Sequence, residues 1–354
     1  MELTVPGQPH AGPARAARGG PGRHDRGSGS GLLGTALTLI HTGQAPTRSA
    51  LTAALNVTRA TAGAIAAELR DLGLIEVDAA PRGGAQGRPS HRLRIDPGGP
   101  VALAAHVYPD GYAVALIGLG GQIVARAASP ADMRGDPALA LAPAAAGAEL
   151  LRRSGRACVG AAFALPTAIA EPEGAAVSPL YLGWPTGTKV RDTIAGLLAD
   201  QDLTVPCQAI NDVNAVALAE HRHGAGTGAA YLLVVSAEHR GVGAALVLRG
   251  ALYTGSTGLS MEAGHVSVDP AGLPCPCGNR GCLNVETDAD RFMTLAGRAA
   301  RPDSPVLDQA TAILAAEYAS DPQVRAAATA IVQRLGLGLA GLINVLNPDR
   351  VLPA

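Results

Sequence analysis

The sequence lacks any long uninterrupted apolar run. It has no stretch of about 18 apolar residues that could cross a membrane, and its first residues lack the apolar core of a secretory signal peptide. These absences argue against an integral membrane protein and against conventional export. We therefore expect a cytoplasmic protein with no membrane partner.

Lysine is also nearly absent, because Lys189 is the only one and arginine carries almost all the positive charge. We attach no function to this bias. Charged residues make up only 16% of the 354 residues, whereas hydrophobic ones make up 47%. This composition argues against an intrinsically disordered chain, and the length allows two or three compact domains.

The charge is unevenly distributed along the chain. Residues 1–100 hold eleven arginines against seven acidic residues, a net charge of +4, and the remaining residues carry a net charge of −5. A basic front on an acidic body is typical of a polyanion-binding head joined to a domain for neutral ligands, although chance clustering gives the same pattern. In a reducing compartment the five cysteines favour free thiols or metal ligands over disulfides.

Composition divides the chain into three parts. Residues 1–30 are rich in Gly, Pro, Ala and Arg and predict a disordered arm. Residues 31–96 predict a small DNA-binding domain, and residues 97–100 read as a linker. Residues 101–354 predict an α/β domain in two lobes, because short apolar strands alternate with Ala-rich helices. The predicted strands are 101–106, 113–117, 123–127, 158–165, 231–236 and 243–248, and the predicted helices are 138–153, 188–200, 213–222 and 323–346.

Residues 31–96 predict a winged helix-turn-helix. One apolar helical pattern begins near Leu32, Thr47 caps a second short helix, and Thr58 caps a third helix that ends at Gly73. A strand, a Gly-rich tip and a second strand follow, which is the pattern of a wing. A helical hairpin that binds protein is the alternative, and the arginines of the wing favour DNA.

The DNA-contacting residues are expected at the start of the third helix and on the wing. Residues 58–62 form the start of this helix and are expected to be exposed. The guanidinium of Arg59 suits contact with a base edge or a phosphate. The wing arginines should contact backbone phosphates. The predicted set is Thr58, Arg59, Thr61, Arg82, Arg88 and Arg92.

The most specific pattern in the chain lies within residues 262–284. Cys275, Cys277 and Cys282 form a Cys-x-Cys-x4-Cys run among Pro and Gly, and His265 lies ten residues upstream. A Cys3His set is a closed tetrahedral zinc site with no position for a reactive water, so the predicted role is structural. Unrelated thiols are the alternative, which three cysteines within eight residues make improbable.

This stretch resembles the signature of the ROK family (repressors, open reading frames and sugar kinases), as does Gly87-Arg88-Pro89 in the predicted wing. The resemblance extends from about residue 32 to the C-terminus. It implies an actin/hexokinase-like (ribonuclease H-like) fold of ATPase type, with a zinc knuckle at 262–284 beside a sugar pocket. It also implies a homodimer or homotetramer.

The resemblance further implies a set of sugar ligands. Residues 211–214 read Asn-Asp-Val-Asn and match the family's catalytic Asn-Asp-x-Asn, while Leu182-Gly183-Trp184 resembles its loop over the sugar and Pro166 its Pro-containing strand end. Asn284 replaces the Glu of the family's Gly-Cys-Leu-Glu, which removes a negative charge and a methylene group from the implied contact with the sugar. The implied sugar-binding residues are Asn211, Asp212, Glu262, His265 and Asn284.

The expected ATP contacts depart from the family pattern. Residues 106–110 read His-Val-Tyr-Pro-Asp where kinases have Asp-x-Gly-Gly-Thr, and Pro109 has no amide hydrogen for a phosphate. In the second phosphate loop only Gly241-Val242-Gly243 survives, which is weak evidence for a nucleotide. Residues 344–351 resemble the approach to an adenosine-binding Gly-Gly, and the chain ends at Ala354 before that element, either truncated or naturally short.

We therefore expect a DNA-binding transcription regulator, a repressor more than an activator, in which Asp212 is a vestigial base and no residue is catalytic. Its expected partners are operator DNA and a sugar or amino-sugar effector, and its expected cofactor is zinc. One alternative is an ATP-dependent sugar kinase with an attached DNA-binding domain. Another is an interaction protein that binds neither sugar nor DNA.

Overall fold

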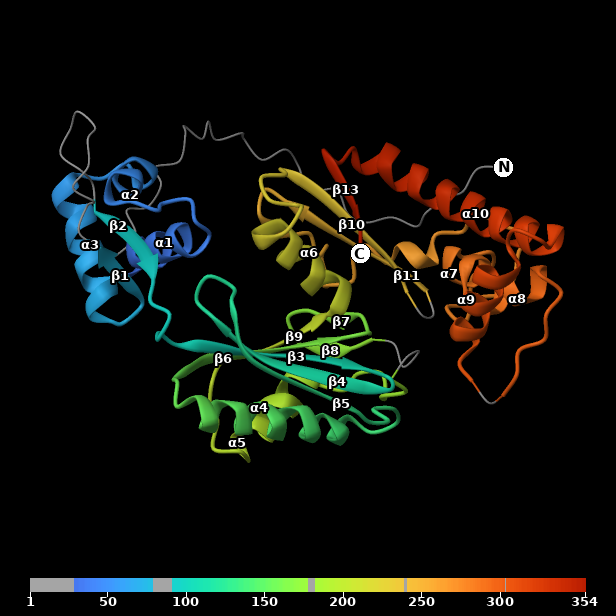
Figure 1. Ribbon diagram of the computed structural model, residues 1–354, viewed down its shortest axis with the longest axis horizontal. Coiled ribbons are helices and arrows are strands. Elements are labelled where there is room, and N and C mark those ends of the chain that lie inside the picture. Colours follow the sequence, from blue (N-terminus) through green and yellow to red (C-terminus); the bar gives the residue numbers. More distant parts are fainter. Residues whose placement is uncertain (1–28, 79–90, 178–181, 239–240, 303) are drawn as a thin grey trace, which may run out of the picture.

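The computed structural model describes residues 29–78, 91–177, 182–238, 241–302 and 304–354. Figure 1 shows a small N-terminal head at one end, in blue, beside two larger α/β lobes. The first lobe runs in the green part of the sequence and the second in the yellow to red part. The predicted arm at residues 1–30 falls almost wholly outside the described residues.

Three helices and a two-stranded sheet form the head: α1 (Gly29–His41), α2 (Arg48–Leu55), α3 (Arg59–Asp71), β1 (Ile75–Asp78) and β2 (Arg92–Ile95). Both predicted N-caps are confirmed, because the Thr47 hydroxyl accepts from the Ala50 amide and the Thr58 hydroxyl from the Thr61 amide. The helices and β1 bury one common apolar core. β1 pairs antiparallel with β2.

The first lobe is a five-stranded mixed sheet in the order β5-β4-β3-β6-β9. Its strands are β3 (Val101–Tyr108), β4 (Gly111–Gly118), β5 (Ile123–Pro130), β6 (Cys158–Leu165) and β9 (Cys207–Asn211). β3, β4 and β5 are antiparallel, while β6 and β9 run parallel to β3. The sheet is covered by α4 (Leu141–Ser154), which follows the short helix η1 (Pro137–Ala140), and by α5 (Val190–Ala199). A small hairpin, β7 (Ile169–Ala170) with β8 (Ala175–Ala176), lies beyond β6.

The second lobe repeats this order in a sheet of β12-β11-β10-β13. Its strands are β10 (Tyr231–Glu238), β11 (Gly241–Leu248), β12 (Ala251–Leu252) and β13 (Arg350–Pro353). Its helices are α6 (Asp212–His223), η2 (Ala263–His265), α7 (Leu283–Thr287), α8 (Ala289–Leu295), α9 (Val306–Glu317) and α10 (Pro322–Leu346). In each sheet an antiparallel meander is followed by a strand parallel to its first strand. Two lobes of this repeated topology define the actin/hexokinase-like arrangement.

The residues of β10 alternate between two apolar layers. Leu232 and Val234 pack on the α6 side, whereas Leu233 and Val235 pack on the side of α7 and α10. This alternation follows from the two-residue period of a strand. The sheet is therefore buried on both faces, with α6 alone on the face nearer the first lobe.

Helix α10 is long and apolar enough to span a membrane by length and composition alone, and it is the one helix among the described residues that passes that test. Two features place it in the second lobe. Leu335, Leu339 and Leu342 pack against the sheet, and the Arg334 guanidinium pairs with the buried carboxylate of Glu286. A helix with one apolar face on a core is a typical component of an α/β lobe.

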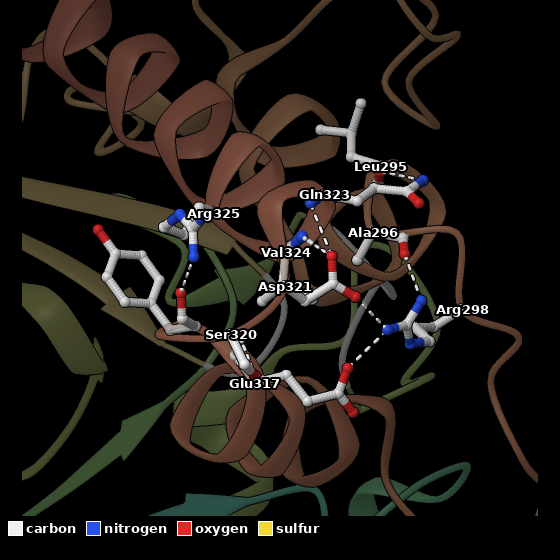
Figure 2. Close-up of polar contacts among 10 residues, drawn as sticks. Leu295, Ala296, Arg298, Glu317, Ser320, Asp321, Gln323, Val324 and Arg325 are labelled. Carbon is white, nitrogen blue, oxygen red and sulfur yellow. Dashed lines mark hydrogen bonds and ion pairs between the residues drawn. The ribbon is translucent and has the colours of Figure 1, made fainter.

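Figure 2 shows how the start of α10 is fastened to the α8–α9 region. The Arg298 guanidinium donates to the carboxylates of Glu317 (2.5 Å) and Asp321 (2.7 Å). Asp321 is also the N-cap of α10 and accepts from the backbone amides of Gln323 and Val324. The hydrogen bond from Arg298 lowers the pKa of the Asp321 carboxyl below its usual value, and the bonds from the two amides act in the same direction.

Candidate ligand pocket and metal centre

A cavity of about 540 Å³ opens between the two lobes, and residues of both lobes line it. The size is typical of a small-molecule site. All five predicted sugar ligands line this cavity, although they come from three separate stretches of the sequence. The lining residues that carry polar side chains are His106, Tyr108, Asp110, Arg134, Thr167, Asn211, Asp212, Ser236, Glu262, His265 and Asn284.

Asn211 and Asp212 lie where β9 of the first lobe passes into α6 of the second. The side-chain oxygen of Asn211 caps α6 by accepting from the Asn214 backbone amide, and its side-chain nitrogen donates to the Thr167 carbonyl oxygen. The Asp212 carboxylate accepts from the Val213 amide. A carboxylate at a helix N-terminus is stabilised by the unpaired amides and by the helix dipole. The strand–helix junction thus fixes both side chains at the cavity wall.

Glu262 precedes the short helix η2, His265 is its last residue, and both line the cavity. Loss of water raises the pKa of the Glu262 carboxyl above its ordinary value; His265 opposes this rise and the Asp212 charge adds to it. Asp212 and Glu262 both line the cavity, so the two acids face the same space. The start of α6 and the segment around η2 therefore bring an acidic pair and a histidine to one cavity.

One polar group of the Asn284 side chain is already hydrogen-bonded within the protein. Its side-chain carbonyl oxygen accepts from the Val242 amide at 2.5 Å, which ties the start of α7 to β11. A Cβ on Gly264 would lie 2.0 Å from that oxygen, so only glycine fits beside it. Asn284 reaches the cavity with its amide nitrogen as the remaining polar group.

The ligand atoms of His265, Cys275, Cys277 and Cys282 all lie within 4.8 Å of one another. The Cys275 sulfur is 3.7 Å from His265 Nδ1, and the Cys277 and Cys282 sulfurs are 3.6 Å apart. A tetrahedron of zinc–ligand bonds of about 2.0–2.3 Å has edges of roughly 3.3–3.8 Å, so these distances fit one ion. The donor set also fits zinc, since three thiolates and one imidazole form a closed site.

The backbone of the knuckle is folded by glycine and by short hydrogen bonds. The Cys275 amide donates to the Asn279 carbonyl oxygen, and the Gly281 amide donates to the Leu273 carbonyl oxygen. Gly281 has φ of +59°, and a Cβ there would lie 1.6 Å from the Asp269 carbonyl oxygen. No other residue fits at that position, so the glycine sets the close approach of the two chain segments that carry the ligands.

Glu286, on α7, supports this knuckle from inside the lobe. It has no exposed area, and its carboxylate accepts from the Leu273 amide at 2.8 Å. The same carboxylate pairs with Arg291 (3.3 Å) and Arg334 (3.1 Å), which joins the knuckle to α8 and α10. No motif in the sequence points to Glu286, and the signal for it is its position two residues beyond Asn284.

The segments that match the family's phosphate loops make structural contacts of their own. Pro109 and Asp110 form the tight turn between β3 and β4, and their carbonyl oxygens accept from the Met133 and Ala131 amides. A Cβ on Gly243 would lie 2.6 Å from the Val213 side chain, so this glycine allows α6 to pack against β11. Close packing thus accounts for a glycine that the sequence pattern connected with phosphates.

Two expectations for individual residues are wrong. Trp184 does not extend over the sugar cavity, because it is 2% exposed in the core of the first lobe and donates to the Met133 carbonyl oxygen. Ala62 is fully buried, because it faces the core of the head and not the exposed side of α3. In both cases an apolar side chain that the sequence pattern placed at the surface is buried in a core.

The other predicted residues of the head lie as follows. Thr58 and Arg59 are exposed at the start of α3, Thr61 is half-buried beside them, and Arg92 is exposed on β2. Arg82 and Arg88, with the Gly-Arg-Pro of the predicted wing, lie outside the described residues. The sequence also did not anticipate Arg134, Met261 and the residues 305–307 at the cavity wall, which no recognisable motif contains.

Comparison with known proteins agrees with this architecture. The ROK family model matches residues 110–353, more than half of the chain. The chain therefore belongs to the ROK family, and its two lobes form that family's actin/hexokinase-like α/β domain. Both regulators and kinases occur among its relatives.

Two curated relatives illustrate this. A glucokinase of Halalkalibacterium halodurans is 32% identical over 164 residues, which cover 43% of this chain and 49% of the relative. The DNA-binding transcriptional dual regulator NagC of Escherichia coli is 31% identical over 161 residues, which cover 44% of this chain and 39% of the relative. In both, the match spans less than half of the relative's length.

Solved structures show the same fold. A ROK-family transcriptional regulator, a homologue of the E. coli MLC protein, has a TM-score of 0.72 over 92% of this chain and 83% of its own, at 23% identity. A ROK-family glucokinase from Streptomyces griseus, in complex with glucose and AMPPNP, has a TM-score of 0.57 over 72% and 82%, at 20% identity. The similarity to the regulator therefore extends beyond the two lobes into the head.

Proposed function

We propose that this protein is a DNA-binding transcription regulator, acting as a repressor, whose ROK domain binds a sugar or amino sugar. The observation that carries the proposal is the combination of an N-terminal head of winged-helix pattern with a cavity lined by sugar-hydroxyl partners. The regulator NagC among its relatives, and the fold match that includes the head, support it.

The head has the elements that a winged helix-turn-helix requires. α2 and α3 are joined by the short turn at Asn56–Val57, and β1 and β2 form the antiparallel pair between which the sequence predicts a wing. The start of α3 would enter the major groove with Thr58, Arg59 and Thr61, and Arg92 would contact phosphate together with the wing residues Arg82 and Arg88. Operators of such regulators are read by paired heads, so we expect a homodimer or homotetramer in the cytoplasm, associated with the nucleoid when bound to DNA.

The cavity would bind the ligand through groups that pair with hydroxyls. Asp212 and Glu262 would accept hydrogen bonds, Asn284 would donate through its amide nitrogen, and Asn211 and one ring nitrogen of His265 would complete the set. With His265 Nδ1 facing the sulfurs, Nε2 would be left for the sugar. Zinc would thereby fix the tautomer and orientation of a ligand-binding histidine, and its role would be structural.

A sugar kinase with an attached DNA-binding head is the second candidate. The glucokinase relative and the position of Asp212 in the cavity favour it, because phosphoryl transfer needs a carboxylate beside the attacking hydroxyl. The proline turn at residues 108–110 and the packing role of Gly243 favour the regulator. An ADP-coupled assay with ATP and a panel of hexoses and amino sugars decides between them: turnover of any sugar would support the kinase.

DNA binding is tested with the duplex upstream of the protein's own gene. We expect Arg59→Ala to weaken binding by about tenfold or more, because Arg59 is placed at a base edge or phosphate. Arg70→Ala is the matched control, since Arg70 lies at the other end of α3 and pairs with Asp71. Equal affinities for the parent and the Arg59 variant would contradict the DNA assignment.

Sugar binding is tested by calorimetry and by the melting temperature with glucose and N-acetylglucosamine as probes. Glu262→Gln should weaken any binding seen with the parent. Glu149→Gln is the control, because that carboxylate lies on the surface of α4 and pairs with Arg152 and Arg153. Absence of binding by the parent across a wider sugar panel would remove the sensing role.

A further inference from the structure

Three parts of the molecule meet at one point on the surface between the head and the lobes. The head contributes His41, the last residue of α1. The first lobe contributes Gly118–Gly121, the turn between β4 and β5, and the second lobe contributes His223, the last residue of α6. Figure 1 shows this turn rising from the first lobe between the head and α6. We call this meeting point the three-way junction.

The contacts at the three-way junction are specific. The Gly120 amide donates to His41 Nδ1 at 2.6 Å, and the rings of His41 and His223 meet edge to face at a centroid distance of 5.6 Å. A Cβ on Gly121 would lie 3.1 Å from the His223 ring, and one on Gly120 would lie 3.6 Å from the Ile95 side chain on β2. The turn thus contacts the head and α6 at once.

His41 can accept the Gly120 hydrogen bond only as a neutral imidazole with its proton on Nε2. Burial, followed by the charges of His223 and Arg222, lowers the pKa of His41, which favours the neutral ring that this hydrogen bond requires. The charged and titratable groups that face His41 from α6 are therefore His223 and Arg222. The contact is stable in the neutral state of the ring.

A second contact fastens the head to the first lobe. The Arg156 guanidinium, just after α4, donates to the Gly99 carbonyl oxygen of the linker through Nε at 2.7 Å and through Nη2. The head is therefore attached to the first lobe through both its linker and the β4–β5 turn. His223 brings the second lobe to the same place.

Helix α6 connects this point with the ligand cavity. It begins at Asn211 and Asp212, which line the cavity, and ends at His223 on the three-way junction. Its twelve residues span about 18 Å, and it packs along β10 and β11, so it moves as a stiff part of the second lobe. A rotation of the second lobe about the β9–α6 connection would move both of its ends.

We propose that the three-way junction of His41, Gly120 and His223 transmits the angle between the lobes to the DNA-binding head. A ligand that bridges Asn211, at the end of β9 in the first lobe, and Glu262 in the second lobe rotates the second lobe against the first, and His223 then moves relative to the β4–β5 turn. His41 can contact both Gly120 and His223 at only one angle between the lobes. The head therefore prefers different orientations in the open and closed states. Ligand and DNA are thereby coupled, as two sites must be when each binds the two states unequally. This inference rests on the proposed function.

The test compares His41→Ala and His223→Ala with the parent, and uses His221→Ala as the matched control. His221 lies on the same helix but contacts the Ala229 carbonyl oxygen of its own lobe. DNA affinity is measured by fluorescence anisotropy on the upstream duplex, with and without saturating glucose or N-acetylglucosamine. Sugar affinity is measured by calorimetry on the same proteins.

We expect the parent and His221→Ala to change DNA affinity by roughly tenfold on adding the effective sugar, within the usual range of allosteric coupling. His41→Ala and His223→Ala should lose most of this change while retaining the parent's affinity for the sugar. His223→Phe should restore part of it, because the ring contact with His41 is kept. Full ligand response in both alanine variants would overturn the inference.

A parent that binds no DNA, or whose DNA affinity no sugar changes, would remove the proposed function and the transmission with it. A responsive parent with responsive alanine variants removes only the transmission, so the two failures are distinguishable. Hydrogen exchange gives a second measurement that needs neither ligand. The Gly120 amide should exchange faster in His41→Ala than in His221→Ala, and equal protection would contradict the contact.

Discussion

At the scale of single residues, the knuckle requires glycine at position 281, where the side chain is a single hydrogen atom. Gly281 combines φ of +59° with a Cβ position 1.6 Å from the Asp269 carbonyl oxygen, so a methyl group cannot be accommodated without moving backbone. We expect Gly281→Ala to displace Cys282, to lower the zinc content measured by atomic absorption and to lower the melting temperature.

Gly278 provides the control for this prediction. It also has a positive φ, +93°, but a Cβ there meets nothing within 4 Å. Gly278→Ala should therefore cost only the left-handed penalty of about 1–2 kcal/mol and retain the metal. Equal zinc contents in the two variants would contradict the steric argument.

At the scale of elements, the N-cap of α3 is the simplest test of the head. Thr58→Ala removes the hydroxyl that accepts from the Thr61 amide, and it should destabilise the head by about 1 kcal/mol. Because Thr58 is also placed at the DNA, its loss should weaken DNA binding more than the loss of Thr47, the cap of α2. Urea unfolding and anisotropy on the same two variants separate the effects; a larger loss of DNA affinity in Thr47→Ala would count against α3 as the recognition helix.

Glu286 tests how α7 and α10 hold the knuckle. Glu286→Gln retains an acceptor for the Leu273 amide but leaves Arg291 and Arg334 without their carboxylate, at 18% and 22% side-chain exposure. Breaking a buried ion pair by removing one partner costs about 3–5 kcal/mol, so urea unfolding should show a large loss.

The more exposed network of Figure 2 is the control for Glu286. Arg298 pairs with Glu317 and Asp321 at the surface, where water screens the charges. Arg298→Met should lower the melting temperature less than Glu286→Gln does. The reverse order would mean that the Glu286 pairs contribute little.

At the scale of the whole molecule, the proposed zinc site would couple stability to ligand binding. We expect Cys277→Ser, or removal of the metal by a chelator, to lower the melting temperature of the lobes and to weaken binding of any sugar that the parent binds. The reason is that His265 belongs to both the metal cluster and the cavity wall. Cys158→Ser is the control, because that thiol lies at the start of β6, outside the cluster. Unchanged sugar affinity in metal-free protein would separate the two sites.

Much of this architecture could be predicted from the sequence. Strand 158–165 agrees residue for residue with β6, helix 323–346 agrees with α10 within one residue, and both caps of the head are where Thr47 and Thr58 place them. Periodic apolar patterns and caps are local properties of the chain, so the sequence contains them directly. The gathering of His265, Cys275, Cys277 and Cys282 was predictable for the same reason, since three of the four lie within eight residues.

The short strands β9, β12 and β13 and the helices α7, α8 and α9 were not predicted, because tertiary pairing and not local pattern holds them. The burial of Trp184 and Ala62 depended on which face the core required. Glu286 contacts Leu273 and Arg334, and the three-way junction joins His41 to Gly120 and to His223. These partners lie far apart in the chain, and a single sequence does not show such pairs.

The sequence by itself thus determined the types of element, the caps and the metal-ligand spacing, because each depends on neighbours within one turn or one loop. Only the tertiary structure decided that Asn211, Glu262 and Asn284 face one cavity. It alone decided that His41 and His223 meet at the end of α6. The physical reason is that these contacts depend on how two sheets and a head pack together, and many sequences with the same local patterns could pack in other ways.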